Sequence, residues 1–368
     1  MKLKKLALCL LALPLVWACS SDNENEEIAP EPTPAPKFFP LKIEVSENPL
    51  VNPSDASSNT GKFKAPITFL NTLEGFNLSY IYETGEDPQE GTPYMYGTEW
   101  VSDNDGKGHW TCGNTGQYGW PSYAVSTTDG GSGDGDIDVT WYAYTDGTNI
   151  QMNIVEGNKN PYLNFTVEES STNQKDLLVS KNIYTWNRTK GVMHFTFDHA
   201  CSALKFYIKK ATNVEDKQIV VSEVKLCNVK KSGRYYLDKQ YGAADCWELL
   251  NPTTDYTLFA ETDPNKAITL VSDKTQYQLL YAGTLSQDQE NAYLFMIPQS
   301  LVAWTPLGSN QSTTSGAYIY LKFKLDGVEK EGRIPFAGTF EMGKKHDVYI
   351  NVGKNSLYDD ATGDKIIK

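Results

Sequence analysis

The sequence lacks most of the features that mark an enzyme or a nucleic-acid-binding protein. It has no C-x-x-C pair, no helical H-E-x-x-H and no phosphate-cradling G-x-x-x-x-G-K-[ST] segment. The stretch Gly130-Gly131-Ser132-Gly133 lacks the closing glycine of a nucleophile elbow. The formal charge of −13 repels phosphate backbones, and no basic stripe with interleaved aromatics offsets it. We therefore predict no enzymatic activity, no cofactor and no nucleic-acid partner.

Cysteine is scarce, and no group of ligands has the spacing of a metal site. His194, His199 and Cys201 come close together in sequence, but on a strand His194 points away from the other two. We therefore predict no metal. Apart from Cys9 and Cys19, four cysteines remain, too few for a disulfide scaffold, and their three possible pairings stay open: Cys112, Cys201, Cys227 and Cys246.

Long apolar runs are also absent, apart from a short one at the start of the chain. A charged beginning is followed by an apolar run from Leu6 to Val16, shorter than the about 20 residues of a membrane span. The next residues, Leu15-Val16-Trp17-Ala18-Cys19, resemble a lipobox. This resemblance implies that residues 1–18 are a lipoprotein signal cleaved after Ala18, with a fatty acyl group such as palmitate on Cys19. The alternative is an ordinary secretory signal that contains a cysteine.

Residues 19–37 have the composition of a linker. An acidic run, Ser20 to Glu27, stays solvated, and the proline-rich run from Ile28 to Pro36 is stiff and extended. The acidic run resembles those that accompany export to the outer face of the outer membrane in Bacteroides-type bacteria. The alternative is that this run is an acidic spacer without a targeting function.

The rest of the chain is typical of strands and turns, with sparse helix signals. Leu41-Lys42-Ile43-Glu44-Val45 alternates apolar and polar residues, and Val139 to Tyr144 is aromatic and β-branched. Glycine-containing turns such as Asp146-Gly147 and Asp326-Gly327 separate such runs. We predict an all-β protein of two tandem β-sandwich domains, residues 38–187 and 188–354, followed by a C-terminal tail, residues 355–368.

Aromatic residues gather in the first predicted domain, with Trp110 and Trp120 among them. Exposed rings of this kind stack on sugars, whereas buried ones fill the space between two sheets. We favour the buried interpretation and keep the glycan-facing one open.

Several motifs, in this order, resemble those of the fimbrillin family of Bacteroidales, the subunits and accessory proteins of surface fimbriae. Each is a hydrophobic pattern, and the order of the set makes the match specific. They are Pro66 to Leu78, Tyr118-Gly119-Trp120-Pro121, Val139 to Tyr144, Asp176 to Ser180, Phe197-Asp198-His199-Ala200-Cys201-Ser202-Ala203-Leu204, Phe295 to Gln299 and Gly343 to Val352.

The resemblance implies two domains of transthyretin-like topology and a role in assembly and cell adhesion. The partners would be other fimbrial subunits, the outer membrane through the lipid anchor, and host or bacterial surface ligands. In polymerising members a protease removes the first strand, here Leu41, Ile43 and Val45, and a donated strand replaces it. The candidate donor is the tail, with apolar positions Leu357, Ile366 and Ile367; its alternative is a frayed terminus.

One departure concerns the cleavage site. Well-studied members are cut after an arginine early in the first domain, whereas the first arginine here is Arg188. Cleavage would have to follow Lys37, Lys42, Lys62 or Lys64, or not occur. Without it, the protein would resemble an anchor or a stand-alone surface lipoprotein.

An outer-membrane glycan-binding lipoprotein is the alternative function.

Overall fold

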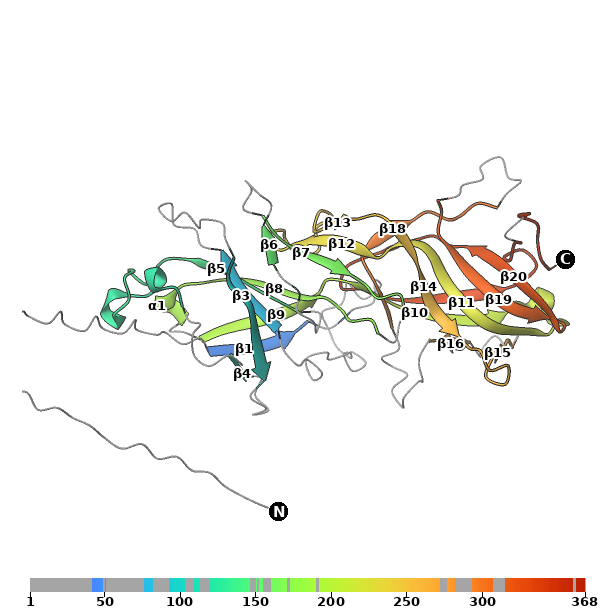
Figure 1. Ribbon diagram of the computed structural model, residues 1–368, viewed down its shortest axis with the longest axis horizontal. Coiled ribbons are helices and arrows are strands. Elements are labelled where there is room, and N and C mark those ends of the chain that lie inside the picture. Colours follow the sequence, from blue (N-terminus) through green and yellow to red (C-terminus); the bar gives the residue numbers. More distant parts are fainter. Residues whose placement is uncertain are drawn as a thin grey trace, which may run out of the picture. The chain divides into compact units, whose positions relative to one another are not determined.

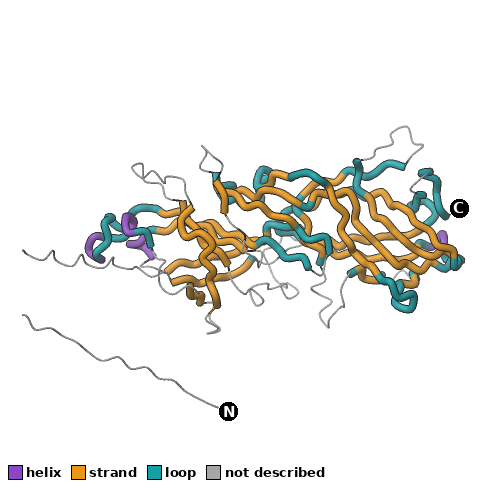
Figure 2. The backbone as a smooth tube through the Cα atoms, viewed as in Figure 1, coloured by secondary structure: helices purple, strands orange, loops and turns teal. Residues whose placement is uncertain are grey.

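The computed structural model describes residues 42–48, 50, 76–81, 93–102, 109–112, 120–145, 150, 152–154, 160–170, 173–189, 192–271, 277–281, 293–306, 315–359 and 362–367. Strands dominate this part of the chain, as Figure 2 shows. Its helical elements are short: α1 (Trp186–Thr189), η3 (Ser122–Ala124), η4 (Thr127–Asp129) and η5 (Thr212–Val214). The prediction of an all-β protein is confirmed.

Seven of the described strands close into one sheet, in the order β1-β4-β3-β2-β5-β8-β9. The contact between β1 and β9 is parallel and closes the ring, while the other six contacts are antiparallel. Figure 1 shows β1 lying beside β9. The strands are β1 (Lys42–Glu47), β2 (Phe76–Ile81), β3 (Pro93–Ser102), β4 (His109–Cys112), β5 (Val139–Thr145), β8 (Leu178–Tyr184) and β9 (Val192–His199).

Aromatic and aliphatic side chains from this closed sheet and from the segment around η3 form what we call the inner cluster. Alternation along β9 places Met193, Phe195 and Phe197 inside, each with 0% exposure, because successive strand residues point to opposite faces. The whole set is Ile43, Phe76, Leu78, Tyr80, Trp120, Ala124, Val125, Val139, Trp141, Ala143, Leu178, Met193, Phe195 and Phe197.

Two further sheets face each other across a second, larger group of buried residues. In one sheet, β10 pairs with β16 and β17 on one side and with β22 on the other. In the other sheet, β14 and β15 pair with β11, which is followed by β19 and β20. Figure 1 shows β14, β11, β19 and β20 in this order. The strands are β10 (Ser202–Lys210), β11 (Ile219–Lys230), β14 (Thr253–Ala260), β15 (Ile268–Thr269), β16 (Gln278–Leu280), β17 (Leu294–Met296), β19 (Tyr318–Leu325), β20 (Val328–Pro335) and β22 (Lys345–Val352).

Alternation also explains this second group, which we call the large cluster. Leu204, Phe206 and Ile208 of β10 point inward toward Leu321 and Phe323 of β19, all with at most 1% exposure. Burying side chains of this size removes enough apolar surface from water to hold the two sheets together.

Smaller sheets complete the fold. The order β13-β12-β7-β6 joins β6 (Met152–Ile154) and β7 (Pro161–Thr166) to β12 (Ser232–Tyr236) and β13 (Trp247–Leu249), while β18 (Gln299–Leu301) pairs with β21 (Gly338–Phe340). Pairings therefore join strands from both sides of residue 187. The division into two transthyretin-like sandwiches at that residue stays a prediction.

Candidate functional site

The predicted removable strand is an integral part of the closed sheet. β1 is in register with β9 along its whole length, from Lys42 opposite Val192 to Glu47 opposite Phe197. Ile43 is 2% exposed in the inner cluster, and Val45 is half-buried against it. Leu41, the third predicted position, lies outside the described residues. Ile43 therefore makes the main apolar contact of β1.

The segment that follows β1 reaches a different part of the core. The amide of Asn48 donates to the carbonyl of Phe197 at 2.8 Å, and its side-chain amide donates to Asp198 at 2.7 Å. Two residues later, Leu50 is 4% exposed within the large cluster. Ile43 and Leu50 thus link one short segment to both clusters, although sequence reasoning identified only the first.

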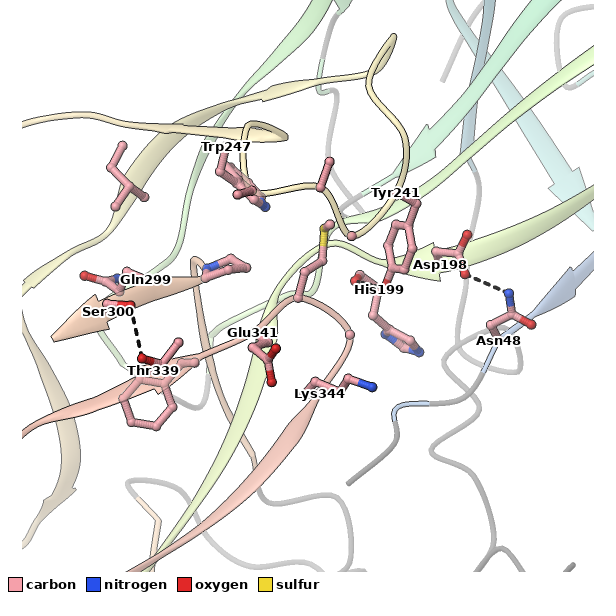
Figure 3. Close-up of a pocket in the computed structure, with 18 residues that line it drawn as sticks. Asn48, Asp198, His199, Tyr241, Trp247, Gln299, Ser300, Thr339, Glu341 and Lys344 are labelled. Atoms are coloured by element: carbon pink, nitrogen blue, oxygen red, sulfur yellow. Dashed lines mark hydrogen bonds between the residues drawn. The ribbon is translucent and has the colours of Figure 1, made fainter. Parts of the chain in front are cut away.

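A cleft of about 910 Å³ opens where β1 ends. Figure 3 shows Tyr241 and Trp247 on one side of it, Glu341 and Lys344 on another, and Asn48 with Asp198 at one end. Apolar side chains of Leu249, Phe340 and Met342 also line it. Aromatic, aliphatic and charged side chains therefore line the cleft together.

Hydrogen bonds hold the walls of the cleft in place. The Tyr241 hydroxyl donates to the carbonyl of His199 at 2.8 Å, and the indole N–H of Trp247 donates to that of Ala200 at 2.9 Å. Ser300 and Thr339 are joined through their hydroxyls at 3.1 Å. These side chains are therefore held in place by the chain itself.

Histidine–carboxylate contacts form on both faces of β9. His199 is 1% exposed and contacts the buried carboxylate of Asp176, while His194 is exposed and lies 3.7 Å from Glu44. Burial raises the pKa of Asp198 above its ordinary value and outweighs the opposing hydrogen bond from Asn48. The two histidines point apart, as strand alternation predicted.

The C-terminal tail, predicted as a strand donor, packs against its own chain. Leu357 and Ile367 are 0% and 2% exposed in the large cluster, and Ile366 is partly buried against it. The Tyr358 backbone pairs with Arg333 at the edge of β20, and also with Lys365, so the tail doubles back on itself. In this state the tail is a folded edge segment whose apolar side chains are already engaged.

The glycan-facing interpretation of Trp120 does not agree with its position. Trp120 is 4% exposed, and its ring lies edge-on to Trp141 and Trp186, with centroids 5.5 and 5.7 Å away. No face of its ring is open for stacking on a sugar, so the core interpretation holds for Trp120. Trp110 lies in β4, and its side chain is outside the described set.

The predicted lipid anchor lies outside the described residues, and so do both residues that define it, Ala18 and Cys19. Among the residues that the structure describes, no helix has the length and apolar composition needed to span a membrane.

Together, these sheets define an all-β protein in which β1 closes the first sheet and the C-terminal tail pairs with the edge of β20. The fimbrillin-like family model matches residues 134–364, and the chain belongs to this family.

Solved structures similar to this chain are described as fimbrial or adhesion proteins. A fimbrial protein from Bacteroides vulgatus is 16% identical, with 84% of this chain and 95% of that chain covered and a TM-score of 0.47. A candidate cell adhesion protein from Bacteroides uniformis is 14% identical, with coverage of 88% and 96% and a TM-score of 0.43. None of the curated proteins matches the sequence.

Proposed function

We propose that the chain is a structural or accessory subunit of a cell-surface fimbrium that serves adhesion and assembles by β-strand exchange. Family membership supports the fimbrial role. The observation that carries the exchange mechanism is the position of residues 42–50, which precede the rest of the folded chain yet contribute Ile43 and Leu50 to two separate clusters. Removing this segment would expose apolar surface in both, and only another strand could cover it again.

The position of Leu50 also ranks the candidate cleavage sites. A cut after Lys37 or Lys42 would leave Leu50, and most or all of β1, attached to the rest of the chain. A cut after Lys62 or Lys64 would separate the whole segment. If cleavage occurs, we expect it at Lys62 or Lys64, two residues that lie outside the described part of the chain.

The tail is the candidate donor strand. Because it is docked on β20, it must first detach before it can be donated. Leu357, Ile366 and Ile367 must leave their own core before they can enter a neighbouring subunit. Exchange would then move these side chains from the core of their own subunit into the core of a neighbour. Because they are buried in the neighbour as well, polymers would dissociate slowly once formed.

Attachment would be through a fatty acyl group on Cys19, with residues 19–37 as a spacer from the outer membrane. A subunit that keeps this group would serve as an anchor, and one cut after Leu50 would join the shaft. The alternative glycan-binding lipoprotein loses one of its two predicted rings, because Trp120 is buried.

Mass spectrometry of the chain's N-terminus on cells, combined with gel electrophoresis of unheated samples, tests the proposal. A start beyond Leu50 together with a ladder of denaturant-resistant multimers supports a shaft subunit. Acylated Cys19 in chains that co-migrate with other subunits supports an anchor. Acylated Cys19 in chains that migrate only as monomers would refute the fimbrial proposal.

A further inference from the structure

A group of tyrosine and lysine side chains covers the outer face of the sheet formed by β10, β16 and β22. Because Leu204, Phe206 and Ile208 point into the large cluster, Lys205, Tyr207 and Lys209 point to the opposite face. Register places Tyr349 of β22 beside Tyr207, and Leu279 of β16 on its other side. This surface, which we call the tyrosine face, plays no part in the proposed strand exchange.

The aromatic rings of the tyrosine face hold one another in defined orientations. Tyr207 and Tyr349 stack with centroids 5.1 Å apart and planes 15° apart, and Tyr277 lies edge-on to Tyr349 at 4.8 Å. The Tyr277 hydroxyl donates to the side-chain oxygen of Asn351 at 3.1 Å. Tyr349 nevertheless keeps 53% of its surface exposed, so an ordered ring faces solvent.

Counted over the residues that the structure describes, the same face is locally basic on a chain whose net charge is −13. Lys205, Lys209 and Lys345 lie on the side of the sheet that carries the rings, with Asp347 as the acidic residue among them. The Lys209 ammonium lies 4.1 Å from the Tyr277 ring centroid and that of Lys205 4.5 Å from Tyr293. Cation–π contacts of this kind fix the positions of both charges beside the rings.

We propose that the tyrosine face binds an acidic polysaccharide. The apolar C–H face of a sugar ring packs on an exposed aromatic ring, while its hydroxyls form hydrogen bonds with phenol, amide and carboxylate groups. Carboxylates of the sugar would pair with Lys205, Lys209 and Lys345. Charge complementarity selects an acidic glycan over a neutral one, because a local excess of lysines attracts anions to an otherwise acidic protein.

The composition of the face argues against a protein partner as its occupant. Protein interfaces have an apolar centre from which charges, lysine above all, are depleted. Here Lys209 lies beside the rings, and the outer positions of the paired segments of β10, β16 and β22 carry two aliphatic side chains, Leu279 and the buried Ala203. A polyhydroxylated, charged ligand suits this arrangement better than a second apolar surface.

Calorimetric titration of the purified mature chain with tetragalacturonate, and with a neutral tetrasaccharide of galactose, tests the proposal. We expect binding of the acidic oligomer, weaker by about tenfold in Tyr349→Ala, which removes the exposed ring. Lys209→Gln should also weaken binding and reduce its dependence on salt. The matched control is Tyr320→Ala on β19, which removes a tyrosine with Lys225 5.7 Å from its ring centroid but lies on the other sheet.

The proposal fails if the wild-type chain binds neither oligomer, if it binds both equally, or if Tyr320→Ala loses as much affinity as Tyr349→Ala. Concentration-dependent dimerisation that Tyr349→Ala abolishes, seen by sedimentation, would also overturn it, because a second copy would then occupy the face. If Tyr349→Ala does not fold, Lys209→Gln and Lys345→Gln carry the test. None of these outcomes depends on polymerisation.

Discussion

Arg333 and Tyr358 form a two-way backbone pair that fixes the C-terminal tail to the edge of β20. The amide of Arg333 donates to the carbonyl of Tyr358 at 2.8 Å, and the amide of Tyr358 donates back at 2.9 Å. The guanidinium of Arg333 also lies over the rings of Tyr318 and Trp304, at 4.2 and 5.3 Å from their centroids. The tail therefore covers part of a strand edge that would otherwise be open to pairing.

Gly332 makes room for this docked tail, and we predict that Gly332→Val releases it. A Cβ atom there would lie 2.4 Å from the Ile366 side chain and 2.9 Å from that of Leu357, closer than such atoms approach. Overpacking of this kind costs about 1–3 kcal/mol. Limited proteolysis should cut residues 355–368 faster in the variant than in the wild type.

Val328→Thr is the control for Gly332→Val, because Val328 lies on the same strand and is 59% exposed. Val328→Thr should leave residues 355–368 as resistant to limited proteolysis as in the wild type. If the tail of Gly332→Val were as resistant to proteolysis as that of the wild type, its docking would not depend on the close packing over Gly332.

The two histidines of β9 offer a matched comparison of a buried and an exposed histidine–carboxylate contact. His199 and Asp176 are 1% and 2% exposed, whereas His194 and Glu44 are 53% and 47% exposed. We predict that Asp176→Ala lowers the free energy of unfolding by about 3–5 kcal/mol, because a buried partner is left behind. Glu44→Ala should cost less than about 1 kcal/mol, since solvent screens the exposed pair. Urea unfolding measures both, and equal costs would refute the argument.

Asp198 should make stability depend on pH in a defined direction. Burial raises its pKa in the folded state, so the folded chain binds this proton more tightly than the unfolded chain does. Its contribution to stability is therefore full at low pH and declines as pH rises above about 4 and through the raised pKa. We predict that Asp198→Asn is more stable than the wild type at neutral pH and equal to it in acid. Urea unfolding at both pH values checks this, and a variant less stable at neutral pH would contradict it.

Cys227 should resist alkylation while the chain is folded. The thiol is 2% exposed, and burial, reinforced by Asp255, raises its pKa to about 12. Since the thiolate is the reactive form, iodoacetamide at about pH 8 should leave Cys227 unmodified in the native chain and modify it in strong denaturant. Peptide mass mapping distinguishes the two, and rapid native modification would show that the site opens readily.

Local patterns predicted the strands of this fold well, because alternation depends on neighbouring residues alone. The pattern of Leu41 to Val45 correctly placed Ile43 inside, and that of Val139 to Tyr144 correctly indicated β5. The interpretations of Trp110 and Trp120 stayed open at the sequence level, since an aromatic ring has the same local pattern whether it fills a core or faces solvent. Only the tertiary structure shows that Trp120 is covered by Trp141 and Trp186.

Features that depend on distant residues could not be read from the sequence. The parallel pairing of β1 with β9 joins segments far apart in the chain, and no local signal specifies it. Leu50 follows Asn48-Pro49, which is typical of a turn, so its burial depends on where the chain goes next. The cleft at the end of β1 gathers residues from five separate parts of the chain, and the tyrosine face needs the register of three strands.

Single substitutions in the first segment should distinguish its two anchors. Ile43→Ala and Leu50→Ala each remove a buried aliphatic side chain, and each should lower the free energy of unfolding by about 2–4 kcal/mol. Val45→Ala is the matched control, with a smaller loss because Val45 is half-buried. Hydrogen exchange should locate the effects, with Ile43→Ala loosening β9 and Leu50→Ala loosening strands around the large cluster. If either variant loosened only its own segment, residues 42–50 would not link the two clusters, and their removal would leave no continuous groove for a donated strand.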